Sequence, residues 1–320
     1  MKLMLKLSAI CTITLVANFS LMAQSKNDAI NSYNAGRSLI QTNSQAAIDS
    51  FEFSLKICNQ LGDSAADVKK NIIQVLPGQY YQVAFKLLSV DKKIPESLVA
   101  AKKALTVAEK YDNAKTKDNV QKLMISAYFA LGNSYFKNNE LDNAIKSFDS
   151  ALVINPNYTK AIFNKAQVYK KQDNSAMFMT TIDDFISKAK ASGDTAQIVP
   201  ANKLALDYLR SAGSKANKAN KLDEALALLN NALKYGIDKD VYYFLADVYN
   251  KKGKFTEGEE NAQKGLDLET GTPEAKAKFY YALAEAKKGK GENACEAFKN
   301  AMYGVFLEPS KAQMTNLKCQ

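Results

Sequence analysis

With 320 residues, only 14 glycines, 6 prolines and no tryptophan, the chain has the composition of an all-helical protein and could form one or two globular domains or a single extended solenoid. Its formal net charge of +10 rests almost wholly on lysine, because Arg37 and Arg210 are the only arginines; the near absence of the guanidinium fork argues against specific recognition of nucleic acids. Histidine is absent, and neither paired carboxylates nor a glycine-rich phosphate loop stands out, so we expect no enzyme, no cofactor and no metal site.

Residues 1–23 have the pattern of a signal peptide. Lys2 and Lys6 form its positive start, an apolar stretch covers residues 7–21, and Ala23 ends a cleavage site. An uncleaved membrane anchor is the alternative, but two polar residues interrupt a stretch already short for a bilayer span. We therefore expect export to the periplasm or beyond, with no transmembrane span after cleavage.

The first helical hairpin is expected over residues 28–61. Ala35 is a small residue on its first helix, and Ala47, Phe51 and Ser54 form a stripe at helical spacing on its second helix. Small residues let two helices approach closely, while a large one fills the gap beside them.

A second hairpin is expected over residues 78–111, with Phe85 at the position of the small residue, so its packing should differ locally. Its stripe consists of Tyr81, Ala84, Leu88, Ser97, Ala101 and Ala104. Residues 63–76 are also helical in pattern, which predicts one overlong helix from about 64 to 89, kinked or restarted at Pro77.

The segment 125–158, preceded by a helical extension at 112–124, has the most regular pattern of the chain. Asn138–Glu140 separate its two helices as a turn, and Pro156 ends the second. The pattern-bearing residues are Tyr128, Leu131, Gly132, Tyr135, Ala144, Phe148, Ala151 and Pro156.

At these eight positions the segment resembles the tetratricopeptide repeat, a 34-residue helical hairpin. The resemblance implies a right-handed α-solenoid of about seven such hairpins, because a single hairpin cannot bury enough apolar surface to fold alone. Further units are expected at 159–192, 206–239, 239–272 and 275–308, with a cap at 309–320. The aromatic stripes are therefore interpreted as core.

These later units match the pattern to different degrees. The second helix of 159–192 is irregular and is expected in a shifted register. The unit at 206–239 carries Leu209, Gly213, Ala216, Ala225, Leu229 and Ala232, and the unit at 239–272 carries Tyr242, Leu245, Ala246, Tyr249, Gly258, Ala262 and Gly265. Thr256 and Glu259 form a capping box in sequence, which predicts the start of a helix there.

The last unit carries Ala282, Ala294, Phe298 and Ala301, and Pro309–Ser310 begin a short helix expected to cover its exposed face. Cys295 and Cys319 would staple this cap through a disulfide in an oxidising compartment, with two buried thiols as the alternative. Cys58 is interpreted as a core residue.

In a tetratricopeptide superhelix the first helix of each pair lines the concave face, so this resemblance places candidate binding residues there. They are Phe129, Asn133, Phe136, Lys137, Phe163, Asn164, Gln167, Lys170, Lys171, Tyr243, Asp247 and Asn250. Asn133 and Asn164 stand at the asparagine positions of the carboxylate clamp, which holds a peptide C-terminus. The full clamp is broken, because Phe129 replaces its first lysine and Asp207 and Ser211 stand where cations are needed.

The leading hypothesis is a non-catalytic scaffold of the bacterial cell envelope that binds a peptide or partner protein along the concave face. A second hypothesis is a glycan- or lipid-associating envelope factor that uses the lysine-rich surface, which binding lost at high salt would favour. A third is an accessory subunit of a secretion or assembly complex. Peripheral association with the envelope is compatible with each of them.

Overall fold

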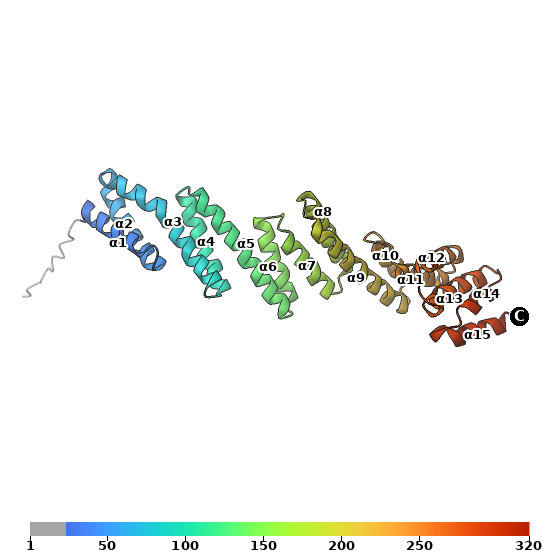
Figure 1. The fold of residues 1–320 in the computed structure, drawn as a ribbon. Helices are drawn as coiled ribbons and strands as arrows, with labels where there is room; N and C mark the ends of the chain where they lie inside the picture. The colour runs from blue at the N-terminus through green and yellow to red at the C-terminus, as the bar shows by residue number, and fades with distance from the viewer. Residues whose placement is uncertain (1–23, 320) are drawn as a thin grey trace, which may run out of the picture. The chain divides into compact units, whose positions relative to one another are not determined.

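The computed structural model describes residues 24–319, so the predicted signal peptide at 1–23 lies outside the described residues (Figure 1). Every regular element between residues 24 and 319 is a helix. Within residues 24–319, seven helical hairpins follow one another, and one further helix comes after the seventh. The chain is thus an all-α solenoid of helical hairpins. It divides into two compact units, the first ending at Met124 and the second beginning at Ile125.

The first unit contains two hairpins and the start of a third. Its helices are α1 (Lys26–Leu39), α2 (Ser44–Leu61), α3 (Ala66–Ser89), α4 (Ile94–Lys110) and the first part of α5 (Ala114–Lys137), with the 3-10 turn η1 (Gly62–Ala65) before α3. α1 packs against α2, α2 against α3, and α3 against α4. The predicted overlong helix is confirmed by α3, in which Pro77 is buried inside the helix without ending it.

In the first hairpin the predicted small position is wrong by one residue. Gly36, not Ala35, is buried, and a Cβ at Gly36 would lie 2.7 Å from the ring of Phe51. The connection to Ala47 is thus one residue shorter than the one from Gly132 to Ala144 in the central repeat. A turn of different length moves the close contact along the first helix by one position.

The next hairpin has the altered packing that Phe85 predicts. Phe85 is 43% exposed, and its neighbour Ala84 is fully buried in its place. The Ser97 hydroxyl donates to the Ala84 carbonyl across the hairpin at 2.8 Å. Both hairpins of the first unit therefore keep the close contact between their two helices. The small residue that makes this contact lies one position away from where the pattern predicts it.

The second unit contains the rest of the series. After α5 its helices are α6 (Leu141–Ile154), α7 (Thr159–Lys171), α8 (Ser175–Ala191), α9 (Ile198–Lys218), α10 (Leu222–Ala232), α11 (Lys239–Lys251), α12 (Phe255–Leu268), α13 (Pro273–Gly289), α14 (Cys295–Asn300) and α15 (Leu307–Asn316), with the 3-10 turns η2 (Thr195–Gln197) and η3 (Gly304–Phe306). Consecutive helices from α6 to α15 pack against one another.

The central repeat is built as its pattern predicts. A Cβ at Gly132 would lie 2.5 Å from the ring of Phe148, which is fully buried, so only glycine permits this approach of α5 and α6. Asn139 makes the turn in the left-handed region with φ 64°. α6 ends at Ile154, before Pro156.

The shifted register predicted for the second helix of 159–192 is wrong. Phe178, Ile182 and Phe185 lie 34 residues after Ala144, Phe148 and Ala151, and all three are buried. α8 therefore keeps the regular register. It looks irregular in sequence because large residues occupy two positions where the central repeat has alanine.

The capping box predicted at Thr256 and Glu259 is also wrong. α12 begins at Phe255 with Lys254 as its N-cap and makes no side-chain capping hydrogen bond. Thr256 lies inside the first turn, so its hydroxyl is not at the position that caps a helix. The buried positions predicted for this unit hold, since Leu245, Ala246 and Ala262 are at most 1% exposed.

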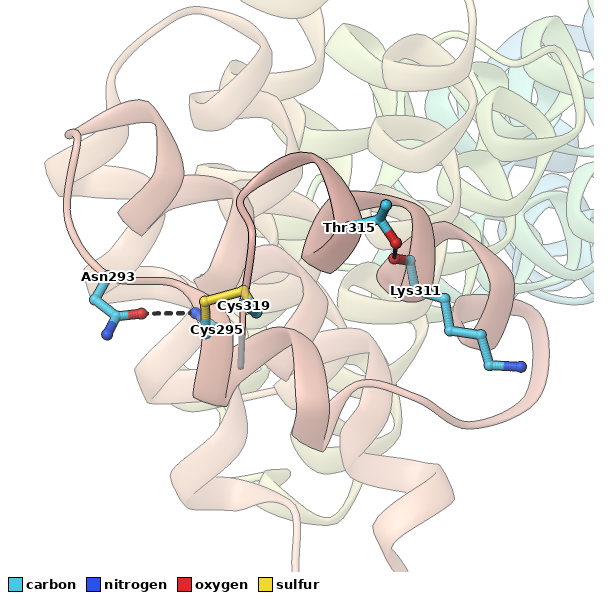
Figure 2. The surroundings of a disulfide bond; sticks show 5 residues. All are labelled: Asn293, Cys295, Lys311, Thr315 and Cys319. Carbon is cyan, nitrogen blue, oxygen red and sulfur yellow. Dashed lines mark hydrogen bonds between the residues drawn. A yellow bond between two sulfur atoms is a disulfide. The ribbon is translucent and has the colours of Figure 1, made fainter.

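The C-terminal cap begins earlier than predicted, at Leu307, with Pro309 in the first turn, where its missing N–H costs no hydrogen bond. α15 packs against α14, and Met314 contacts the core cluster of the last hairpin. A disulfide joins Cys295 at the start of α14 to Cys319 just after α15 (Figure 2). Among residues 24–319, none of the helices combines the length and apolar character needed to cross a bilayer.

Candidate functional site

The candidate residues on the first helices of the second unit lie on α5, α7 and α11. We call the surface formed by the first helices of these hairpins, from α5 to α13, the first-helix face. The structure groups the candidates into two sets. One set joins α5 to α7, and the other lies between α11 and α13.

In the first set the two clamp asparagines bind each other. The Asn164 amide donates to the Asn133 carbonyl oxygen at 2.6 Å, and Gln167 donates to Asn164 at 3.3 Å. These contacts tie α7 to α5. Part of the hydrogen-bonding capacity that a peptide terminus would need is therefore used within the protein.

The aromatic candidates of this set are half-buried and pack internally. Phe129 has its ring 5.9 Å from Phe148 and 5.4 Å from Tyr158, and the ring of Phe163 lies 5.0 Å from Phe185. Lys171 lies over Phe136, at 5.3 Å from the ring centroid, while Lys137 is exposed and Lys170 half-buried. This part of the face therefore consists of aromatic rings that pack against buried rings, together with hydrogen-bonded asparagine and glutamine side chains.

The second set lines a cavity. Tyr243, Asp247 and Asn250 from α11 open onto a space of about 420 Å³. Its other walls are Lys251 of α11, Phe255 of α12, Tyr281, Ala282, Glu285, Lys288 and Gly289 of α13, and Phe306 of η3. Three residues predicted from sequence therefore share one site with neighbours that the sequence did not indicate.

On the α11 side, Asp247 is the centre of a polar network. It accepts hydrogen bonds from Asn217 of α9 at 2.6 Å and from Lys251 at 2.8 Å, and Lys251 also donates to Asn217 at 2.8 Å. Burial and the nearby Asp247 carboxylate raise the pKa of Tyr243 to about 12, so its hydroxyl stays protonated at neutral pH. Lys278 lies over the ring of Tyr243, with its Nζ 5.6 Å from the ring centroid.

On the α13 side, Glu285 pairs with Lys288 at 2.6 Å through its Oε2. Its Oε1 is buried and has no hydrogen-bond partner. Burial, followed by the charge of Glu285, raises the pKa of Tyr281. Two tyrosines and two carboxylates therefore face the same space from two helices.

Asn250 connects the two sides. Its amide donates to the Ala282 carbonyl at 2.8 Å, which ties α11 to α13. Its Oδ1 also lacks a hydrogen-bond partner, but this atom lies against Gly258, where a Cβ would approach it to 2.1 Å. This oxygen and Glu285 Oε1 are both buried without a hydrogen-bond partner.

The C-terminal cap forms one end of the cavity. Phe306 lies with its ring 5.2 Å from Tyr281, and Lys288 donates to Gln313 of α15 at 3.3 Å. The disulfide between Cys295 and Cys319 anchors the far end of this segment to α14 (Figure 2). The shape of the cavity therefore depends on the position of the cap.

Sequence reasoning missed Tyr281, Glu285, Lys288 and Phe306. One signal was available, because Glu285 stands eleventh in its unit, where Tyr135, Tyr169 and Tyr249 stand in three other units. None of the seven units except the last has a carboxylate at this position, so Glu285 marks a place where the packing differs. Within residues 24–319, no group of three acidic or cysteine side chains is placed to hold a metal ion.

Comparisons with known proteins agree with the hairpin pattern. Residues 125–158 and 212–268 each match a family model described as tetratricopeptide repeat. No curated protein sequence matches the chain.

Several solved structures are similar at low identity. The crystal structure of MamA protein is 18% identical over 62% of this chain and 97% of its own, with a TM-score of 0.36. YrrB, titled a TPR protein with an unusual peptide-binding site, is 16% identical over 61% of this chain and 91% of its own, with a TM-score of 0.34. A tetratricopeptide repeat protein from Parabacteroides merdae is 15% identical over 90% of this chain and 98% of its own, with a TM-score of 0.28.

Proposed function

We propose that the first-helix face of the second unit binds an extended segment of a partner protein. The chain is a tetratricopeptide-repeat protein, and proteins of this class act as protein–protein interaction scaffolds. The cavity between α11 and α13 would anchor that segment. The observation that carries this proposal is the cavity itself, with aromatic walls and a few polar groups at one place on the face. The α5–α7 part of the face would then guide the segment rather than anchor it.

Binding to an arrayed library of random-sequence peptides tests this proposal. Tyr281→Ala removes an aromatic wall, and we expect it to weaken the bound peptides by about tenfold or more, as for a residue that anchors an interface. Phe53→Ala is the matched control, because Phe53 is 48% exposed on α2 in the other unit. Peptides that bind both variants and the unchanged protein equally would place the contact surface elsewhere.

We further propose that the protein acts in the bacterial cell envelope after export. The signal-peptide pattern at residues 1–23 and the Cys295–Cys319 disulfide support this location, because disulfides persist in oxidising compartments. Cell fractionation and the intact mass of the mature protein after alkylation test it. The proposal expects an N-terminus near Gln24 and one alkylated thiol, Cys58, after denaturation without reductant. Four alkylated thiols, Cys11 included, on a chain that keeps residues 1–23 would contradict it.

A surface that attracts anionic glycans or lipids through lysine is the competing function. The same binding measurement at low and high salt distinguishes the two, because attraction between exposed charges weakens as salt screens them. Binding that disappears at high salt and is unaffected by Tyr281→Ala would favour the lysine surface.

A further inference from the structure

The cavity holds a carboxylate where the repeat pattern has an aromatic core residue. Glu285 replaces the tyrosine found at that position in three other units, and its side chain is 27% exposed. One oxygen pairs with Lys288, and the other is buried without a partner. The side chain lines the cavity, so its negative charge acts on any group that enters this space.

The walls around this carboxylate suit a positive charge. Tyr243, Phe255, Tyr281 and Phe306 all line the cavity. The face of an aromatic ring attracts a cation, and a cation removed from water is attracted more strongly. Asp247 adds a second carboxylate on the opposite wall.

The hydrogen-bonding capacity left in the cavity is mainly that of acceptors. Lys251 and Lys288 each already donate to a carboxylate and to one amide oxygen, that of Asn217 or Gln313. An ammonium group has three donors, whereas a carboxylate offers about four lone-pair positions. Glu285 uses one of these and Asp247 two, so a ligand that donates hydrogen bonds finds more partners than one that accepts them.

We propose that the cavity receives a positively charged side chain, arginine or lysine, of the segment bound on the first-helix face. The guanidinium or ammonium group would lie between the rings of Tyr243 and Tyr281 and pair with the accessible part of the Glu285 carboxylate side chain. This inference rests on the proposed function for the source of the side chain. The chemistry of the cavity can be tested without a peptide.

The first arm of the test titrates the purified protein with N-acetyl-arginine amide and with N-acetyl-citrulline amide, which has nearly the same shape but no charge. Resonances of selectively labelled tyrosines report binding. We expect saturable shifts with arginine amide. The affinity for citrulline amide should be at least about tenfold lower, because it loses a charged hydrogen-bonded pair. Equal affinities, or no saturable shift with arginine amide, would overturn the proposal.

Glu285→Gln tests the group named. It keeps the side-chain shape and removes the charge, so it should reduce arginine amide binding to the level of citrulline amide. Glu260→Gln is the matched control, an exposed carboxylate of α12 that does not line the cavity. If circular dichroism shows that Glu285→Gln disturbs the fold, Asp247→Asn replaces it as the second test of the acidic wall, with a smaller loss expected. Arginine amide binding that survives both substitutions would refute the assignment.

The second arm uses the peptide library and separates the two proposals. Bound peptides enriched in arginine or lysine at one position, with that preference lost in Glu285→Gln, support the inference. Bound peptides without a basic preference refute it and leave the proposed function intact. If no peptide binds while arginine amide still does, the cation site stands and the proposed peptide function fails.

Discussion

The two units each contain a cavity of about 420 Å³, and the carboxylates in these cavities differ. In the first unit Glu52 is exposed and accepts a hydrogen bond from the Tyr80 hydroxyl, in a cavity that also has Lys56 and Lys110 in its walls. In the second unit Glu285 pairs with Lys288, and its side chain lines a cavity with aromatic walls. The first carboxylate binds a tyrosine of its own unit, whereas the second lines the cavity that we propose as a cation site.

The units also depart from the repeat pattern in different ways. The first changes its register, at Gly36 and at Ala84, and both changes are absorbed by packing. The second keeps its register through α8 and changes the residue type instead, at Glu285. A change of residue at a fixed position puts new chemistry on a surface, whereas a shifted turn only moves the same contacts.

The largest expected effect tests the fixed register of the second unit. Phe178→Ala should lower its free energy of unfolding by about 3–5 kcal/mol, as Phe148→Ala should, because both remove a fully buried ring. Met177→Ala is the control, since Met177 is 40% exposed and should cost about 0.5 kcal/mol or less. Denaturant unfolding measures all three. A small effect at Phe178 with a large one at Met177 would restore the shifted register.

Reducing the disulfide should have the next largest effect, and only in the second unit. The bond closes a loop with a sequence separation of 24, so its loss should lower the free energy of unfolding by about 3 kcal/mol. Cys319→Ser provides the same test without reductant. Cys319→Ser treated with reductant is the control, because this variant has no Cys295–Cys319 bond left to lose. Unfolding curves that are unchanged by Cys319→Ser would show that the bond does not hold the cap.

Alkaline pH should lower the stability of the second unit partly through Tyr243 in its cavity. The folded pKa of Tyr243 is about 12, above its ordinary value of 10.0, so its contribution is complete below pH 10 and is lost as pH rises from 10 to 12. We expect a loss of about 1–2 kcal/mol, because solvent still reaches part of the ring. Tyr243→Phe should remove this part of the pH dependence. If the free energy of unfolding of Tyr243→Phe falls between pH 10 and 12 as much as that of the unchanged protein, the Tyr243 hydroxyl is not buried.

The smallest effect contrasts two tyrosines. Tyr80→Phe deletes the hydroxyl that donates to Glu52 and should cost the first unit about 1 kcal/mol. Tyr281→Phe should change the free energy of unfolding of the second unit by about 0.5 kcal/mol or less, since no hydrogen bond depends on its hydroxyl in residues 24–319. Thermal unfolding measures both changes. A larger loss at Tyr281 would mean that its hydroxyl already makes a hydrogen bond within the protein.

Much of the fold could be predicted from sequence, because the pattern of small and large residues determines how two helices approach. Gly132 opposite Phe148 and the long helix before Ser89 are examples. The position of Gly36 was missed, since a turn shortened by one residue leaves no mark in composition. The helix start at Phe255 was missed because a capping motif in sequence competes with hairpin packing, and packing decided the boundary.

The candidate site could be predicted only in part. Tyr243, Asp247 and Asn250 were found from their offsets on a first helix, and they lie together in the cavity. Its other half belongs to α13 and η3, where the series ends and the following hairpin is replaced by the cap. Phe306, whose ring contacts Tyr281, lies in a short 3-10 turn. Helical periodicity in the sequence does not predict such a turn.

Site-specific photo-crosslinking in intact cells that produce the protein tests the central claim most directly. A benzophenone amino acid would replace Tyr281 in the cavity or, as the control, Phe53 in the first unit, with mass spectrometry of the products. The account predicts crosslinks from Tyr281→p-benzoylphenylalanine to a partner protein segment that contains arginine or lysine, and none from the control. Crosslinks from the Phe53 position alone would contradict it.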